Sequence, residues 1–85
     1  MSRINHIAPS APHPDNLLVV EKLSMVADLL EAQSASVFRV RAYRAAAEEV
    51  AGMASPVADI LHKGGRQALV DLPHIGTSIA AAIQE

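Results

Sequence analysis

The sequence contains no cysteine and no tryptophan, and it has a single phenylalanine, Phe38, and a single tyrosine, Tyr43. Without cysteine there are no disulfides and no thiolate metal sites, and a reducing, cytoplasmic setting is expected. The scarcity of aromatic residues argues against an all-β fold, whereas abundant alanine, leucine, valine and glutamate favour helix. No apolar run approaches the ~20 residues of a membrane-spanning helix, so no membrane partner is expected.

The chain of 85 residues is long enough for one small domain, and its net charge of −2 is unevenly distributed. From Arg39 to Arg66 there are five basic and three acidic residues, whereas residues 1–31 carry two basic and four acidic residues. An anionic partner is therefore expected to meet the second half of the chain.

Proline, glycine and capping residues divide the chain into an arm and a set of helices. Three prolines within residues 1–14 predict a flexible arm, in which His6 and His13 are solvated. Asp15 or Asn16 can cap a helix over residues 16–33, and Ser36 can cap one over residues 37–53. The first of these helices has an apolar stripe at helical spacing and an acidic outer face.

The second half of the chain predicts shorter helices. Ser55 as cap and Pro56 at the first position open a helix that Gly64 ends. A fourth short helix follows over residues 66–72, and a last one begins at Thr77 or Ser78. We therefore predict an all-α, compact bundle of four to five short helices over residues 15–85. Because the last helix is still largely apolar where the chain ends, we expect a fragment of a longer protein.

Basic residues of the second predicted helix fall into two groups. Arg41 and Arg44 lie opposite the inner stripe, and Arg44 and Glu48 form an i,i+4 pair. Arg39 instead lies one turn from Tyr43 at the edge of that stripe. It either holds an anion at the start of the helix or packs its stem and extends its charge into water.

The stretch LPHIG at residues 72–76 predicts a tight turn between two helices. Pro73 ends the first helix, Ile75 packs into the core, and Gly76 permits backbone angles that a side chain resists. Ala80 is small enough for close helix packing. The turn directs the N–H groups at the start of the next helix outward, where they form an anion site suited to a phosphate of any base sequence.

Two stretches carry a resemblance to a known family. LPHIGTSIAAAI resembles the helix-hairpin-helix DNA-binding motif in Leu72, Pro73, Ile75, Gly76, Ala80 and Ile83. With FRVRAYRAAAEEV at residues 38–50, residues 15–85 resemble the N-terminal domain of family X DNA polymerases of the DNA polymerase beta type. That resemblance implies a helical domain for DNA repair that binds gapped or nicked DNA and holds its 5′-phosphate.

Carried over residue by residue, the resemblance gives Arg39 and Tyr43 the phosphate pocket and Phe38 the ring beside the template base. The family's phosphate-binding lysine falls on Ser78, and its Schiff-base lysine falls on Ala82, which has no amine. The domain is therefore expected to bind DNA as a monomer without lyase catalysis, and more weakly than lysine-bearing relatives.

Other candidate contacts surround the turn. His74 replaces a glycine of the motif, and it either reaches the phosphate or points into solvent. Backbone N–H groups from Gly76 to Ser78, Thr77 among them, and the side chains of Arg44 and Lys63 complete the predicted DNA-binding set. The resemblance also implies a monovalent cation on the backbone carbonyls of Val70, Leu72 and Ile75, and no other cofactor.

Two alternatives to a non-catalytic DNA-binding module remain. A helical scaffold for protein interactions accounts better for the net charge of −2. A lyase that uses Lys63 is the third hypothesis. The DNA-binding hypothesis implies a nucleoid-associated location in the cytoplasm.

Overall fold

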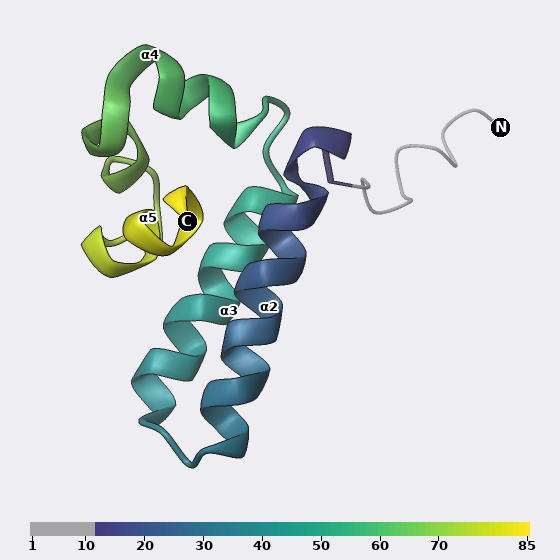
Figure 1. The fold of residues 1–85 in the computed structure, drawn as a ribbon, viewed down its shortest axis with the longest axis vertical. Coiled ribbons are helices and arrows are strands. Elements are labelled where there is room, and N and C mark those ends of the chain that lie inside the picture. Colours follow the sequence, from purple (N-terminus) through teal and green to yellow (C-terminus); the bar gives the residue numbers. More distant parts are fainter. Residues whose placement is uncertain (1–11) are drawn as a thin grey trace, which may run out of the picture.

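Helices make up all the regular structure of residues 12–85, the part of the chain that the computed structural model describes. A 3-10 helix, η1 (Pro14–Asn16), leads directly into α2 (Leu17–Ala32). The chain continues through α3 (Val37–Ala51), α4 (Val57–Val70) and α5 (Thr77–Gln84) (Figure 1). The prediction of an all-α bundle of four to five helices is confirmed.

Helices α2 and α3 form a long antiparallel hairpin (Figure 1). Ala27, Leu30 and Val40 are buried between them. The turn follows from the end of α2, where Ser34 adopts a left-handed φ of 59°. The N–H groups of Ser34 and Ala35 donate to the carbonyls of Glu31 and Leu30 at 3.0 and 2.9 Å, the Schellman arrangement that satisfies the last carbonyls of a helix.

The predicted cap of α3 is confirmed. The Ser36 hydroxyl accepts a hydrogen bond from the Phe38 N–H at 3.1 Å. This bond satisfies one of the N–H groups that a helix start leaves without an intrahelical partner. It also places Phe38 and Arg39 in the first turn of α3.

The main core lies where α4 and α5 pack against the hairpin formed by α2 and α3. It contains side chains from all four α-helices and from the turn before α5, namely Leu23, Ala46, Ala47, Val50, Val57, Leu69, Ile75, Ile79 and Ala80. Ala80 has no exposed surface, as its predicted role in close packing requires. Burial of these apolar side chains contributes ~25 cal/mol per Å2 removed from water and is the main stabilising term.

The predicted caps of α2 and α4 need correction. Asn16 makes no side-chain bond to the start of α2, and Ser55 makes none to α4. Pro56 is the N-cap of α4 rather than its first helical residue, because its backbone is extended. The Asn16 side chain instead accepts from the Val57 N–H at 2.8 Å and donates to the Ser55 carbonyl at 3.0 Å. Asn16 is completely buried, so these two bonds satisfy a polar group that would otherwise destabilise the fold.

The predicted end of the third helix at the glycine pair is confirmed, because the helical backbone of α4 is broken at Gly65 and continues over residues 66–70. Gly65 has φ 70° and ψ −167°, a conformation essentially restricted to glycine. After the kink, Arg66 Nε donates to Gln84 Oε1 at 2.6 Å and ties α4 to α5. The glycine pair therefore bends the chain so that residues 66–70 can approach α5.

The N-terminal arm is described only at its end. His6 and the rest of residues 1–11 lie outside the described part of the chain. His13 Nδ1 accepts a hydrogen bond from the Asp15 N–H at 3.1 Å and so caps η1. No helix within residues 12–85 is both long enough and apolar enough to span a bilayer.

Candidate nucleic-acid interface

The segment from Leu72 to Gly76 turns sharply between α4 and α5. The Leu72 N–H donates to the Leu69 carbonyl at 3.0 Å, and the Ile75 N–H donates to the Leu72 carbonyl at 3.2 Å. Ile75 is 2% exposed, so the predicted insertion of this side chain into the core is confirmed. The buried isoleucine holds the turn against the helices while its neighbours on either side remain exposed.

The unusual backbone angle of the turn belongs to His74 rather than to Gly76. His74 has φ 66°, the left-handed conformation that histidine tolerates better than most residues. Gly76 has φ −86° and ψ −178°, which any residue adopts, so the expectation of a special angle there is wrong. A Cβ at Gly76 would meet nothing within 4 Å. The glycine leaves open space in front of α5.

The start of α5 presents backbone donors to solvent. No side chain caps this helix, and Gly76, Thr77 and Ser78 are all exposed. Among residues 12–85 the N–H groups of these three residues have no hydrogen-bond partner. Unpaired N–H groups at a helix N-terminus, together with the helix dipole, attract an anion.

An open pocket of about 690 Å3 lies between the first turns of α3 and the turn before α5. Its lining contains seven of the nine predicted DNA-binding residues, Phe38, Arg39, Tyr43, His74, Gly76, Thr77 and Ser78. Val70, Leu72 and Ile75, the predicted cation ligands, also line it, together with Ala42 and Ile79. The start of α3 and the turn before α5, which are far apart in the sequence, thus share one surface. They are held together because Tyr43 packs against the core cluster that contains Ile75.

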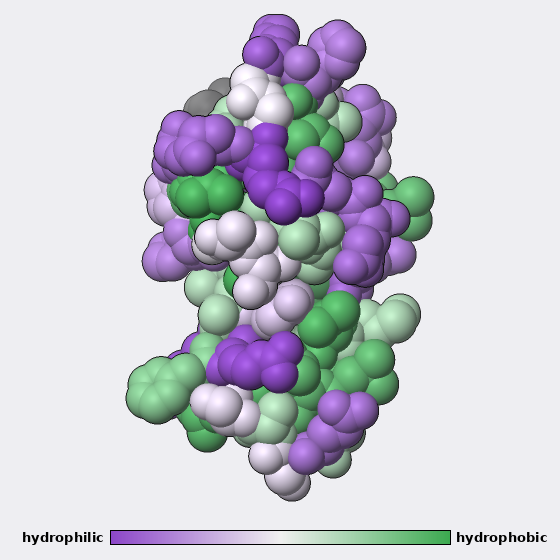
Figure 2. Space-filling view, turned by 60° about the vertical axis from the view of Figure 1, so that its left-hand side comes forward, coloured by the Kyte–Doolittle hydropathy of each residue, from purple (hydrophilic) through white to green (hydrophobic). Residues whose placement is uncertain are grey.

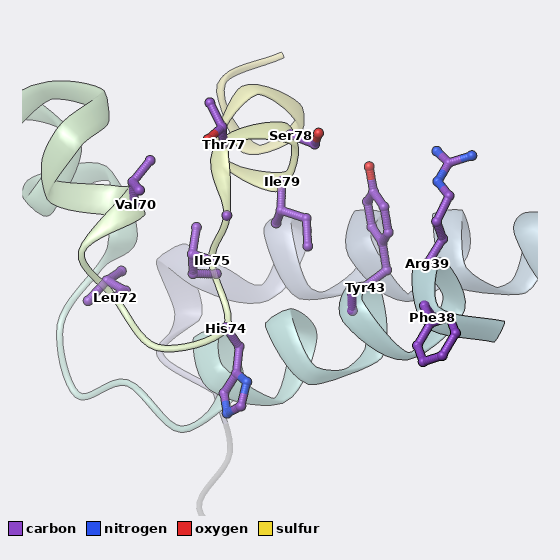
Figure 3. A pocket seen from close by; sticks show the side chains of 12 residues that line it. Phe38, Arg39, Tyr43, Val70, Leu72, His74, Ile75, Thr77, Ser78 and Ile79 are labelled. Atoms are coloured by element: carbon purple, nitrogen blue, oxygen red, sulfur yellow. The ribbon is translucent and has the colours of Figure 1, made fainter. Parts of the chain in front are cut away.

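The polar groups in the pocket point in two directions. Figure 3 shows the Arg39 guanidinium and the Tyr43 hydroxyl extending toward the side on which Thr77 and Ser78 lie. The rings of Phe38 and His74 point to the other side. The pocket therefore combines a polar side, at the start of α5, with a side that carries two exposed rings.

The three arginines of α3 differ in their partners. Arg44 Nη2 lies 3.1 Å from Asp28 Oδ1 and 2.9 Å from Glu31 Oε1. The hydrogen bond with Asp28 raises the pKa of Arg44 above its ordinary value, with a smaller contribution from Glu31. Arg39 and Arg41 have no such carboxylate within residues 12–85.

Arg44 is thus outside the pocket, and the predicted pair with Glu48 is not formed. The reason is the antiparallel hairpin, which brings two carboxylates of α2 within reach of the guanidinium. Arg39, one turn earlier on another face, keeps its charge available to a ligand.

Lys63 is also outside the pocket. It lies exposed on α4, before the kink at Gly65.

The face of the molecule drawn in Figure 2 is uneven in hydropathy. Hydrophilic side chains cover most of its upper part, where α4 and α5 lie, and more hydrophobic ones cover its lower part, toward the end of the α2–α3 hairpin. Within residues 12–85 no three histidine or acidic side chains are grouped as metal ligands.

A comparison with protein families identifies the domain type. The family model of the helix-hairpin-helix domain matches residues 14–85, most of the chain and all of its described helices. The chain therefore belongs to the helix-hairpin-helix domain family. Domains of this family are in general nucleic-acid-binding domains. No curated protein matches the chain significantly. No solved structure does so either.

Proposed function

We propose that this domain is a non-catalytic DNA-binding module that contacts the phosphate backbone of gapped, nicked or otherwise irregular DNA without base specificity. One observation supports it above all: Arg39, Tyr43 and the uncapped start of α5 line one open pocket. A guanidinium, a hydroxyl and unpaired N–H groups are all donors to phosphate oxygens. The resemblance to the N-terminal domain of family X polymerases supports the same proposal.

The polar side of the pocket suits a terminal phosphate of a DNA strand. A 5′-phosphate carries more charge than an internal phosphodiester and can approach the open space in front of Gly76. Ser78 adds a hydroxyl but no charge, so the affinity depends on salt less steeply than it would with a lysine there. Phe38, 81% exposed, offers a ring on which an unpaired base can stack.

Titration with DNA tests the proposal. The 15N-labelled 85-residue chain is mixed at low salt with a gapped duplex that carries either a 5′-phosphate or a 5′-hydroxyl. We expect amide shifts at residues 39–43 and 74–78, and tighter binding of the phosphorylated duplex. Absence of shifts, or shifts confined to α2, would contradict the proposal and favour the protein-interaction scaffold.

The proposal includes the absence of lyase activity. Ala82 has no amine, and Lys63 does not line the pocket. A Schiff base needs a primary amine close to the sugar carbonyl. Borohydride trapping on a duplex with an abasic site is expected to give no covalent adduct; an adduct that disappears in Lys63→Arg would establish the third hypothesis instead.

A monovalent cation at the hairpin forms a separate part of the proposal. The backbone carbonyls of Val70, Leu72 and Ile75 would hold it, and all three residues line the pocket. Such a cation would add positive charge beside the phosphate site. Replacing K+ by a bulky organic cation at constant ionic strength is expected to shift the amides of residues 70–76 and to weaken DNA binding.

A further inference from the structure

A stripe of large apolar side chains on α2 remains exposed. Leu18, Met25 and Leu29 are 78%, 61% and 55% exposed, whereas Leu23, on the opposite side of the helix, is completely buried. Positions separated by seven and four residues lie on one face of an α-helix. Single exposed apolar residues are ordinary on a protein surface, but an aligned set along one helix is typical of a contact surface.

Acidic side chains border this stripe on one flank. Glu21 and Asp28 each follow a stripe residue by three positions and so lie beside it. Glu21 has no ion pair within residues 12–85. The Asp28 carboxylate binds Arg44 but its side chain is still 70% exposed.

The opposite flank carries Lys22, which lies 3.8 Å from the carboxylate of Glu85. The face of α2 is therefore apolar along its centre, with the carboxylate of Glu21, unpaired within the described residues, and the Arg44-bound carboxylate of Asp28 along one side. Its residues are distinct from those of the pocket.

The carboxylates on one flank favour a partner helix that carries positive charge. An antiparallel pair of two α2 helices, packed stripe to stripe, would place the two Glu21–Asp28 flanks against each other and lose affinity by repulsion. Three exposed side chains suit contact with one helix rather than with a broad surface of about 800 Å2 per partner. A single amphipathic helix with positive charges along one flank matches both the size and the charge of the face.

We propose that the Leu18–Met25–Leu29 face of α2 docks one amphipathic helix of a protein partner, with lysine or arginine side chains of that helix along Glu21 and Asp28. The module then has two faces: the pocket at the start of α5 for DNA and the stripe on α2 for protein. This inference does not depend on the DNA-binding proposal.

Two designed peptides test this docking face. Each has about 18 residues, five helical turns, with leucines at helical spacing, and carries either lysines or glutamates on one flank. The probe is added to the 15N-labelled 85-residue chain without DNA. We expect saturable shifts at Leu18, Met25 and Leu29 with the lysine peptide, and about tenfold weaker binding of the glutamate peptide.

Variants separate a specific site from general stickiness. Leu18→Gln combined with Met25→Gln is expected to abolish binding of the lysine peptide, while Val37→Gln, at a residue 59% exposed on α3, leaves it unchanged. Glu21→Lys alters no apolar contact, and it is expected to reverse the preference between the two peptides. Thermal unfolding by circular dichroism checks that each variant is folded.

Equal affinity for both peptides, shifts located outside α2, or binding that survives Leu18→Gln with Met25→Gln would each overturn the proposal. So would self-association in sedimentation equilibrium that these substitutions remove, because a second copy would then occupy the face.

Discussion

The side-chain oxygen of Asn16 accepts a hydrogen bond from the N–H of Val57 at 2.8 Å, across 41 residues of sequence. The same carboxamide donates to the Ser55 carbonyl at 3.0 Å. One buried side chain at the start of α2 thus caps α4 and fixes where α4 leaves the α2–α3 hairpin. The position of α4 in turn determines where α5 and the turn at residues 72–76 meet α3.

Asn16→Ala is therefore expected to lower the free energy of unfolding by about 2–3 kcal/mol, because a helix cap is lost and a buried carbonyl and N–H lose their partners. Urea denaturation followed by circular dichroism measures the change. Ser55→Ala is the matched control. Its hydroxyl caps nothing, and a change within about 0.5 kcal/mol is expected. Comparable losses in both variants would show that the cap is shared.

Gly65→Ala is expected to destabilise the protein by about 1–3 kcal/mol, because φ 70° with ψ −167° is strained for any residue with a Cβ. Gly52→Ala provides the comparison. Gly52 has an ordinary φ of −87°, and a Cβ there would lie 3.5 Å from the Glu48 carbonyl, an ordinary contact. This variant is expected to be neutral or more stable by about 0.4–1 kcal/mol. Thermal unfolding of both variants gives the test.

Arg39→Ala is expected to weaken binding of a 5′-phosphorylated gapped duplex by about tenfold without changing the unfolding midpoint, since a charge-assisted hydrogen bond is lost at an exposed position. Arg44→Ala should do the opposite. It removes the two ion pairs with α2, which are exposed and therefore weak, so the urea midpoint is expected to fall slightly while DNA affinity changes little. Fluorescence anisotropy and urea denaturation measure the two quantities. A larger effect of Arg44→Ala on DNA binding would place the interface on the other side of α3.

Ser78→Lys is expected to strengthen binding and to steepen its dependence on salt. Neutralising one further phosphate increases the slope of log K against log salt concentration by about 0.9 for duplex DNA. Measurement at four or more salt concentrations gives the slope. Ala58→Lys, at an exposed position of α4 that does not line the pocket, adds the same charge and controls for net charge. Equal slopes for the two variants would argue against a phosphate at the start of α5.

His74→Gly is expected to leave stability unchanged or raised by up to about 1 kcal/mol, because glycine adopts φ 66° without steric cost but has more freedom in the unfolded chain. His74→Val, with a β-branched side chain at the same φ, is expected to lose about 1–2 kcal/mol. Urea denaturation of both variants tests this. A marked loss in His74→Gly would mean that the imidazole makes a stabilising contact.

Several features of this protein follow from local sequence. The spacing of Leu23, Ala27 and Leu30 specifies the buried side of α2, and Ser36 specifies where α3 begins, because periodicity and capping act within a few residues. The insertion of Ile75 into the core and the turn at Pro73 follow in the same way. The motif at residues 72–83 identified the hairpin, and helical spacing with the resemblance of residues 15–85 singled out Arg39 and Tyr43, which both line the pocket.

Other features depended on contacts between distant segments. The local pattern could not show that Asn16 caps α4 or that Arg44 binds Asp28 and Glu31. Each outcome depends on which groups packing brings within hydrogen-bond or ion-pair distance, and that choice is made only when α4 and α5 close on the α2–α3 hairpin. The sequence by itself determined the helices and their inner faces; the tertiary structure decided which polar groups pair with one another and which are left free at the pocket.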